Sequence, residues 1–487
     1  MPLAMAVDPD LPARLARASD AHTDDDAQRD LAADPAVKVR RTLAKNAVAT
    51  ADALRLLARD TDEAVRSAVA GHPNTPIEAV EALVNDPLAA VRAKARRNRG
   101  LSRADKARLA AITDEGVLRG HLDARVATQG PRAEAFRARV ATCSTDGASL
   151  PGRLRKRLVD ALSQGPSPDA WSALCDALEG ARWTDSARAA AAAWLEPQLA
   201  AWPDPLRVTD PRWMRRLDRD EDEPWLGLAR TGVATGRHWS ESLPVKLAAC
   251  PWLAAWTTLD LHDLPLGPLG ASVLFASPYL GALRALNLNT TGLGPVGTLH
   301  LVACPALSAL ASLSLGWCGL HATSFRALGD APFAPVLQHL ELTANGRAWT
   351  DTDAPGAHLT TWTRFAALES LRLTYNNLGD EGLAALLNSP QVARLRDLDL
   401  QANGLTDATA HLLASSPHLG RLERLVLVAN FLSVEGMRAL AASPHLGALR
   451  ALDVSCAFAK AEAEAVMQAL GAVQARGCMV TADVLDV

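Results

Sequence analysis

The sequence predicts an α/β fold in which a solenoid of short strands and helices follows an all-α solenoid. First, pairs of leucines separated by one residue recur with a 27-residue period through the C-terminal half of the chain. Second, prolines recur between these pairs with the same period. Third, aspartate, valine and arginine recur with a 26-residue period near the N-terminus. Fixed periods of this size predict repeated units that bury their apolar side chains only by stacking on one another.

The first solenoid is predicted over residues 1–109, with two helices in each copy. Asp34, Asp60 and Asp86 are evenly spaced at this shorter period, and a Val-Arg pair follows each after the same interval. Where proline follows the aspartate, we expect the aspartate to cap the first helix of the copy. The segment His72–Pro76 resembles the leucine-rich repeat variant family, an α-solenoid similar to HEAT-type repeats. One branch of that family holds an iron–sulfur cluster on N-terminal cysteines, but no cysteine precedes Cys143, so we expect no cofactor.

The end of the first solenoid is basic. Our candidate basic patch comprises Arg92, Arg96, Arg97, Arg99 and Arg103. Such a patch is typical of nucleic-acid binding, or else of a solvated face in an arginine-rich protein. Aromatic side chains that would stack on bases are missing nearby, which favours the second interpretation.

Residues 110–250 lose both periods and are predicted to be mostly helical. Seven tryptophans gather here, and we expect them to pack short helices into a cap for the second solenoid, although an aromatic binding box is the alternative: Trp171, Trp183, Trp194, Trp202, Trp213, Trp225 and Trp239. The acidic turn at residues 218–224 is predicted to be an exposed loop. Its spacing fits no calcium-binding loop, and we expect no metal.

The second solenoid is predicted over residues 251–487. Eight Leu-x-Leu cores start at Leu259 and end at Val454, and they keep a constant step except for a longer one from Leu340 to Leu371. Alternating leucines face one way from a short strand, and an apolar run with helical character follows each of them. Asparagines at the turns, such as Asn376, are expected to bond to backbone groups. We expect the prolines to end the helices, and residues 479–484 to form a ninth strand at the sheet edge.

These units resemble the leucine-rich repeat family, and the turn from Asn376 to Gly382 is most similar to the ribonuclease-inhibitor-like subclass. The resemblance implies a horseshoe with a parallel sheet on its concave side and helices outside. It also implies protein binding rather than catalysis. The irregular repeat at residues 345–367 is predicted to carry a protruding loop that contacts a partner, or else to be a decayed repeat.

The residues between the strand leucines are predicted to line the concave face over about 40 Å, which suffices for a protein interface. Acidic residues outnumber basic ones there, which argues against nucleic acid on this face. Trp317 and Tyr375 lie at the strand-to-turn edge, either as partner anchors or as a cover for the sheet. Our candidate partner-binding residues are Asp260, His262, Trp317, Glu341, Arg372, Tyr375, Asp399, Gln401, Arg424 and Val426.

Catalytic motifs are missing from the sequence. A match to Gly-x-Gly-x-x-Gly at residues 292–297 is a repeat turn, because its residues recur one period earlier. Seven cysteines form no Cys-x-x-Cys pair, which favours reduced thiols and a cytoplasmic location. The net charge of −4 and the lack of a long apolar run give no indication of a membrane.

We therefore predict a bacterial, cytoplasmic, non-catalytic scaffold that binds another protein on its concave face. The first alternative is a regulator of a small GTPase, because the repeats resemble those of GTPase activators. The second alternative is nucleic-acid binding through the basic patch. The sequence does not identify the partner.

Overall fold

The computed structural model describes residues 10–84, 89–101, 103–179, 184–221, 223–345, 359, 362–387, 389–457 and 460–483. The chain divides into two compact units, Met1–Gly120 and His121–Val487. The division into regions that meet at residues 109 and 250 remains a prediction. Helix α8 (Arg103–Thr142) runs through residue 109 without a break.

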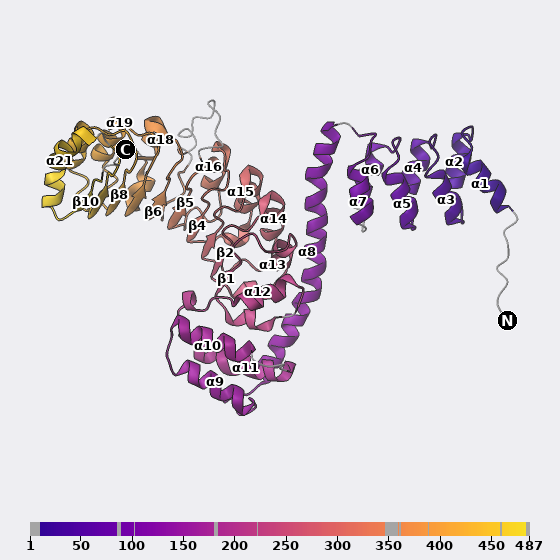
Figure 1. Ribbon diagram of the computed structural model, residues 1–487, viewed down its shortest axis with the longest axis horizontal. Coiled ribbons are helices and arrows are strands. Elements are labelled where there is room, and N and C mark those ends of the chain that lie inside the picture. The colour runs from indigo at the N-terminus through magenta and orange to yellow at the C-terminus, as the bar shows by residue number, and fades with distance from the viewer. Residues whose placement is uncertain are drawn as a thin grey trace. The chain divides into compact units, whose positions relative to one another are not determined.

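The first unit is a stack of short helices joined by tight turns (Figure 1). Thr50 and Asp62 cap their helices by accepting backbone N–H groups, as such side chains do at helix N-termini. The helices before α8 are α1 (Leu11–Ser19), α2 (Asp25–Ala32), α3 (Val37–Leu43), α4 (Ala51–Leu57), α5 (Glu63–Ala70), α6 (Ile77–Leu83) and α7 (Ala89–Arg96).

One detail of the predicted capping is wrong. Helix α3 starts at Val37 with Ala36 at the N-cap, so Asp34 lies too early to cap it. The Asp34 carboxylate instead accepts the N–H of Ala36 at 2.8 Å and pairs with Arg14 of the preceding copy at 3.1 Å. Asp34 therefore joins neighbouring copies rather than starting a helix, and Asp86 lies outside the described residues.

Side chains link successive copies of the first solenoid along two lines. Arg40 makes two hydrogen bonds to the Asp60 carboxylate, at 2.6 and 3.0 Å, and both side chains are largely buried. The amide of Asn98 donates to the carbonyls of Ala70 and His72, at 3.0 and 2.9 Å. His72 contacts the carbonyl of Asn46 at 2.8 Å in the same way.

The second unit starts with a helical cap whose core is built on tryptophan. The ring centroid of Trp171 lies 6.4 Å from the ring centroids of both Trp202 and Trp213. Trp213 and Trp225 are fully buried. These contacts support the packing interpretation, while Trp183 lies outside the described residues. The cap elements are the second half of α8, α9 (Gly152–Leu162), α10 (Pro168–Glu179), α11 (Asp185–Leu199), η1 (Asp204–Leu206), α12 (Pro211–Asp218), η2 (Pro224–Leu228) and α13 (Leu243–Ala248).

Within the described residues, ten strands form one parallel sheet in sequential order, which begins before the last cap helix, α13 (Figure 1). The strands pair in register, leucine against leucine, as for Leu259 with Leu286. They are β1 (Thr231–Val233), β2 (Thr258–Asp260), β3 (Ala285–Asn287), β4 (Ser312–Ser314), β5 (His339–Glu341), β6 (Ser370–Arg372), β7 (Asp397–Asp399), β8 (Arg424–Val426), β9 (Ala451–Asp453) and β10 (Met479–Thr481).

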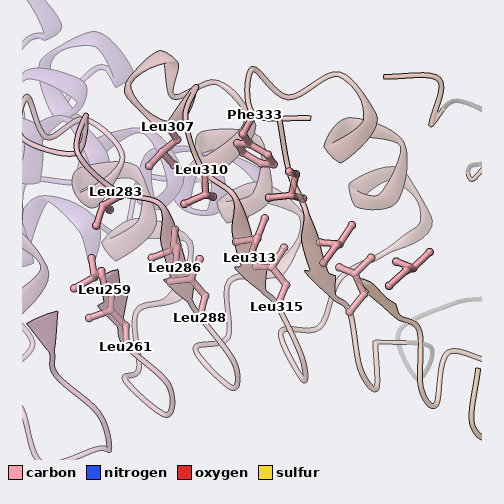
Figure 2. Close-up of a cluster of buried hydrophobic side chains, with 14 of the residues drawn as sticks. Leu259, Leu261, Leu283, Leu286, Leu288, Leu307, Leu310, Leu313, Leu315 and Phe333 are labelled. Carbon is pink, nitrogen blue, oxygen red and sulfur yellow. The ribbon is translucent and has the colours of Figure 1, made fainter. Parts of the chain in front are cut away.

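Helices cover one face of this sheet, and we call the opposite face the concave face. The leucines that point toward the helices form the continuous core in Figure 2. The covering helices are α14 (Gly267–Leu274), α15 (Gly294–Val302), α16 (Ala322–Gly329), α18 (Gly379–Leu387), α19 (Asp407–Ser415), α20 (Val434–Ala442) and α21 (Ala463–Ala475). The repeated prolines do not end these helices but open short 3₁₀ turns after them, including η3 (Pro251–Ala255), η4 (Pro305–Leu307) and η6 (Pro390–Arg394).

Strand β1 lies in the region that the sequence predicted to be free of the leucine period. Gly232 occupies the place of a repeat leucine, and it pairs with Leu259. A Cβ atom on Gly232 would lie 2.2 Å from the ring of Trp256, so the indole fills the space that a leucine would take. Residues before β1 close this edge: Val208 forms a bridge to Thr231, and the N–H of Thr209 donates to the carbonyl of Thr231 at 2.8 Å.

Candidate functional site

The central row of the concave face carries polar side chains from successive strands. It runs from β2 to β9 and comprises Asp260, Asn287, Ser314, Glu341, Arg372, Asp399, Val426 and Asp453. Each residue lies beside the next because the strands pair in register. Val426 is the exception in exposure, since only 3% of its surface is accessible.

Several members of this row also shape the strand ends. The side chains of Asp260, Asp399 and Asp453 each accept the backbone N–H two residues further on, at 3.1 Å. Such local bonds satisfy a donor that the sheet leaves open at the turn. Asp260 also bonds to the ring of His262 at 2.9 Å, so these two predicted residues lie together.

Charges on the concave face are only partly balanced. Arg424 lies 3.0 Å from Asp397, and Arg372 lies 3.8 Å from the same carboxylate. Glu341 accepts a hydrogen bond from the Thr343 hydroxyl at 3.3 Å. Within the described ranges, no ion pair of Glu341, Asp399 or Asp453 is found.

A shallow hollow of about 210 Å³ opens on the concave face at β4 to β6. The hollow forms because the serine side chains that line it are small, and Glu341 and Arg372 lie beside these serines. The lining side chains that face it are Ser312, Ser314, His339, Glu341, Ser370 and Arg372. The sequence identified Glu341 and Arg372 as candidates but gave no signal that a depression would form between them.

Trp317 and Tyr375 occupy equivalent turn positions after β4 and β6. Both have a left-handed backbone, with φ of 55° and 56°, and about half of each side chain is exposed (52% and 51%). The same turn position holds Ala344, Ala402 and Ala429 in other repeats, with φ between 52° and 56°. The fold therefore does not require an aromatic side chain at this position. Gln401 lies at the turn after β7, on the same edge of the sheet.

The turns themselves are held by a line of buried asparagines. The Asn403 side chain accepts the N–H of Asn376 at 3.1 Å and donates to the carbonyls of Leu373 and Gln401, at 2.9 and 3.1 Å. Asn345, Asn376 and Asn430 bond in the same manner. In the repeat before that of Asn345, Cys318 takes the asparagine position. Its thiol donates to the carbonyl of Leu288 at 3.0 Å. Burial raises the pKa of this thiol, as expected for a structural cysteine.

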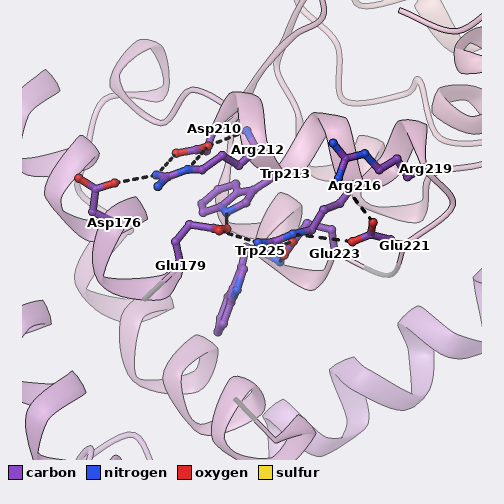
Figure 3. Close-up of polar contacts among 10 residues, drawn as sticks. All are labelled: Asp176, Glu179, Asp210, Arg212, Trp213, Arg216, Arg219, Glu221, Glu223 and Trp225. Atoms are coloured by element: carbon purple, nitrogen blue, oxygen red, sulfur yellow. Dashed lines mark hydrogen bonds and ion pairs between the residues drawn. The ribbon is translucent and has the colours of Figure 1, made fainter. Parts of the chain in front are cut away.

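A charged network in the cap corrects the prediction for the acidic turn (Figure 3). Glu223 is not exposed: it is 3% accessible, and Arg216 bridges it to Glu179 of α10. Burial raises the pKa of the Glu223 carboxyl, although Arg216 opposes this effect. Trp213 donates to Glu179 at 3.0 Å, so the network binds the helices of the cap together. Asp222 lies outside the described residues.

The basic patch is only partly described. Arg97 and Arg99 are exposed, and Arg92 is half-buried, whereas the side chains of Arg96 and Arg103 lie outside the described residues. In the irregular repeat at residues 345–367, residues 346–358, 360 and 361 also lie outside the described residues. The described part is packed: Trp362 stacks on Phe325 with ring centroids 6.3 Å apart and donates to the Phe325 carbonyl.

The described residues offer neither a metal site nor a membrane span. No group of three or more His, Cys, Asp or Glu side chains that could hold a metal ion is present in them. None of the helices in the described ranges combines the length and apolarity needed to cross a bilayer.

Comparisons with known proteins give two family matches. Residues 63–88 match the family model "Leucine rich repeat variant", and residues 367–387 match the model "Leucine Rich repeat". Among solved structures, the chain is similar to an internalin from Listeria monocytogenes strain 4b F2365, with 16% identity and a TM-score of 0.30. That match covers 56% of this chain and 89% of the internalin. No curated protein matches.

Proposed function

We propose that this chain is a non-catalytic scaffold. It is a leucine-rich repeat protein with a leucine-rich-repeat-variant region, and such repeats in general serve protein–protein interaction. In this proposal the partner is another protein, and it binds on the concave face. The face is long, polar and open, as binding surfaces of solenoids are. A bacterial origin and a cytoplasmic location remain predictions.

The observation that carries the proposal is the pair of half-exposed aromatic side chains beside an incompletely neutralised row of charges. Trp317 and Tyr375 occupy turns that hold alanine in other repeats, so the turn conformation does not require an aromatic side chain there. Large aromatic side chains dominate the binding energy of many protein interfaces. Glu341 and Asp399, which have no ion pair within the described part of the chain, lie on the strands between and beside these turns.

Site-specific cross-linking in cells tests this proposal. A photoreactive phenylalanine analogue would replace Gln401 or Thr343, which are both partly exposed on the concave face, and Gln468, which is exposed on α21, in a control. We expect the same protein to be cross-linked from both concave positions and not from Gln468. If neither concave position yields a discrete cross-linked protein, concave-face binding is wrong.

One alternative keeps an observation in its favour. Arg97 and Arg99 are exposed at the end of the first solenoid, as a nucleic-acid contact would require. Changing both to glutamate in the full chain should abolish any mobility shift of single- or double-stranded RNA or DNA at low salt, because phosphate contacts are electrostatic. The absence of a shift with the unchanged protein would exclude this alternative. The small-GTPase alternative remains a prediction from family resemblance.

A further inference from the structure

We propose that the central row of the concave face between β5 and β9 receives an α-helix of the partner, with basic side chains at every seventh position. This inference rests on the proposed function, because it names the partner's chemistry at the same face. The row reads Glu341, Arg372, Asp399, Val426 and Asp453 on five adjacent strands.

The charges determine which side chains the partner must bring. Arg372 and Arg424 already share Asp397, so their charges are partly compensated within the chain. Glu341, Asp399 and Asp453 have no such ion pair among the described residues, and all three are partly buried. A partner that covers them removes water from three carboxylates, which is costly unless it supplies cations. Partners without basic side chains at these positions are therefore rejected.

The spacing of the carboxylates determines the partner's secondary structure. Glu341, Asp399 and Asp453 lie on every second strand, so they are about 9.6 Å apart at the usual strand separation of about 4.8 Å. In an α-helix, residues i and i+7 share a face and lie about 10.5 Å apart. In an extended peptide, side chains on one face lie about 6.7 or 13 Å apart. The helical repeat fits, and a modest tilt of the helix across the strands absorbs the remaining difference.

The residues between the carboxylates complete the pattern. Arg372 lies between Glu341 and Asp399, where an acidic residue at i+4 of the helix would face it. On β8 the row holds the buried Val426, and the partly buried Val428 lies beside it, so no charge is offered there and an apolar residue is expected at i+11. The hollow around Ser312, Ser314 and Ser370 leaves room for the first basic side chain to reach Glu341. The expected partner face is basic, acidic, basic, apolar and basic.

Binding of designed helices to the full-length chain tests the inference. The matched probe is an alanine-based helical peptide of about 25 residues, long enough to be helical in water. It carries lysines at i, i+7 and i+14, glutamate at i+4 and leucine at i+11. The control peptide has the same composition but places its lysines at i, i+5 and i+10, which point to three sides of the helix. We expect the matched probe to bind about tenfold more tightly in fluorescence anisotropy, with affinity that falls as salt rises.

Variants of the chain locate the contact. Glu341→Gln and Asp399→Asn should each weaken the matched probe about fivefold, whereas Glu435→Gln on the exposed side of α20 should leave its affinity unchanged. Glu341→Lys should lose the matched probe and regain affinity for a probe with glutamate at i. Circular dichroism of each variant verifies that the fold is retained.

These experiments distinguish a failure of the helical pattern from a failure of concave-face binding. If both peptides bind equally, or neither binds, while Gln401 and Thr343 still cross-link a protein, the helical pattern is wrong and concave-face binding stands. If the concave positions cross-link nothing as well, both proposals fail.

Discussion

The two solenoids of this chain join their repeats by different chemistry. In the first, charged side chains cross from copy to copy, as Arg40 does to Asp60 and Arg14 to Asp34. In the second, the backbone of a parallel sheet joins the repeats, and neutral asparagines such as Asn376 and Asn403 hold the turns. Helices pair most of their backbone groups internally, so the backbones of neighbouring copies do not bond to one another. Side chains must therefore supply the links. Strands share their backbone bonds with the next repeat.

The difference predicts how each array responds to mutation and to pH. A charged link titrates, and its contribution to stability varies with the state of its carboxylate. An amide link does not titrate. The two units can be followed separately, because all 12 tryptophans lie after residue 120 and report only the second unit.

The largest effect is expected at the asparagine line. Asn403→Ala removes hydrogen bonds to Asn376, Leu373 and Gln401 and leaves buried backbone groups without partners. We expect a loss of about 3 kcal/mol in the free energy of unfolding. Denaturant unfolding followed by tryptophan fluorescence measures it, with Gln468→Ala on the exposed side of α21 as the control. A loss below about 1 kcal/mol would show that the strands alone hold the turns.

A smaller loss of stability, which depends on pH, is expected in the first solenoid. Burial opposes ionisation of Asp60, but hydrogen bonds from Arg40 and the Asp62 N–H hold its pKa below the ordinary value. A depressed pKa contributes stability above the ordinary pKa, and this contribution is lost as pH falls through the folded value. At pH 7, Asp60→Asn should therefore destabilise α3 to α5 by about 2 kcal/mol.

Hydrogen exchange of peptides from α3 and α5 measures this change, with exposed Asp30→Asn as the control. The difference between Asp60→Asn and the unchanged chain should shrink as pH falls from 5 to 3. Over the same range, the effect of Asn403→Ala should stay constant relative to the unchanged chain. Equal pH dependence of the two variants would contradict the distinction between charged and neutral links.

An intermediate case lies on the outer side of the second solenoid. Asp380 accepts the N–H groups of Thr406 and Thr409 at 3.0 and 3.2 Å, and also both hydroxyls. Asp380→Asn keeps one acceptor oxygen, so we expect a loss of about 1 kcal/mol. Tryptophan fluorescence during urea unfolding measures it, and Glu381→Gln on the exposed neighbour should be silent. A loss as large as that of Asn403→Ala would place the main link on the outside.

The smallest effect is expected at the position of the first solenoid that holds either asparagine or histidine in successive copies. Asn98 and His72 occupy equivalent positions, and both contact a carbonyl of the preceding copy. His72→Asn should therefore change stability by less than about 0.5 kcal/mol, since the amide can make the bonds that Asn98 makes. Hydrogen exchange of α5 peptides measures it, beside exposed His22→Asn. A larger loss would mean that the ring packs in a way that an amide cannot replace.

Periodicity in the sequence was sufficient to place most of the second solenoid. Leu259 to Val454 mark β2 to β9, and Met479–Thr481 form the strand that was expected after them. The first strand of the sheet was missed because Gly232 replaces the repeat leucine and the ring of Trp256 fills its space. Pro224, one repeat length before Pro251, was the available signal. A tryptophan in one repeat that compensates for a glycine in another is a tertiary effect that no local pattern contains.

The candidate site was predicted in part for the same reason. Strand alternation places Glu341, Arg372 and Asp399 on one face, and this follows from the sequence. The sequence could not tell that Asp397 would engage both Arg372 and Arg424, because that depends on side-chain directions across three strands. Nor could it tell that Glu223 would be buried, because its partner Arg216 reaches it only through the packing of the cap.

The closed first edge of the sheet has a consequence for how copies of this molecule meet. A parallel array whose last strand met the first strand of another copy would grow head to tail into a fibre. Such growth needs both ends to be available in every copy. Val208 and Thr209 occupy the backbone beside β1, and blocking one terminus is enough to stop the polymer at its first link.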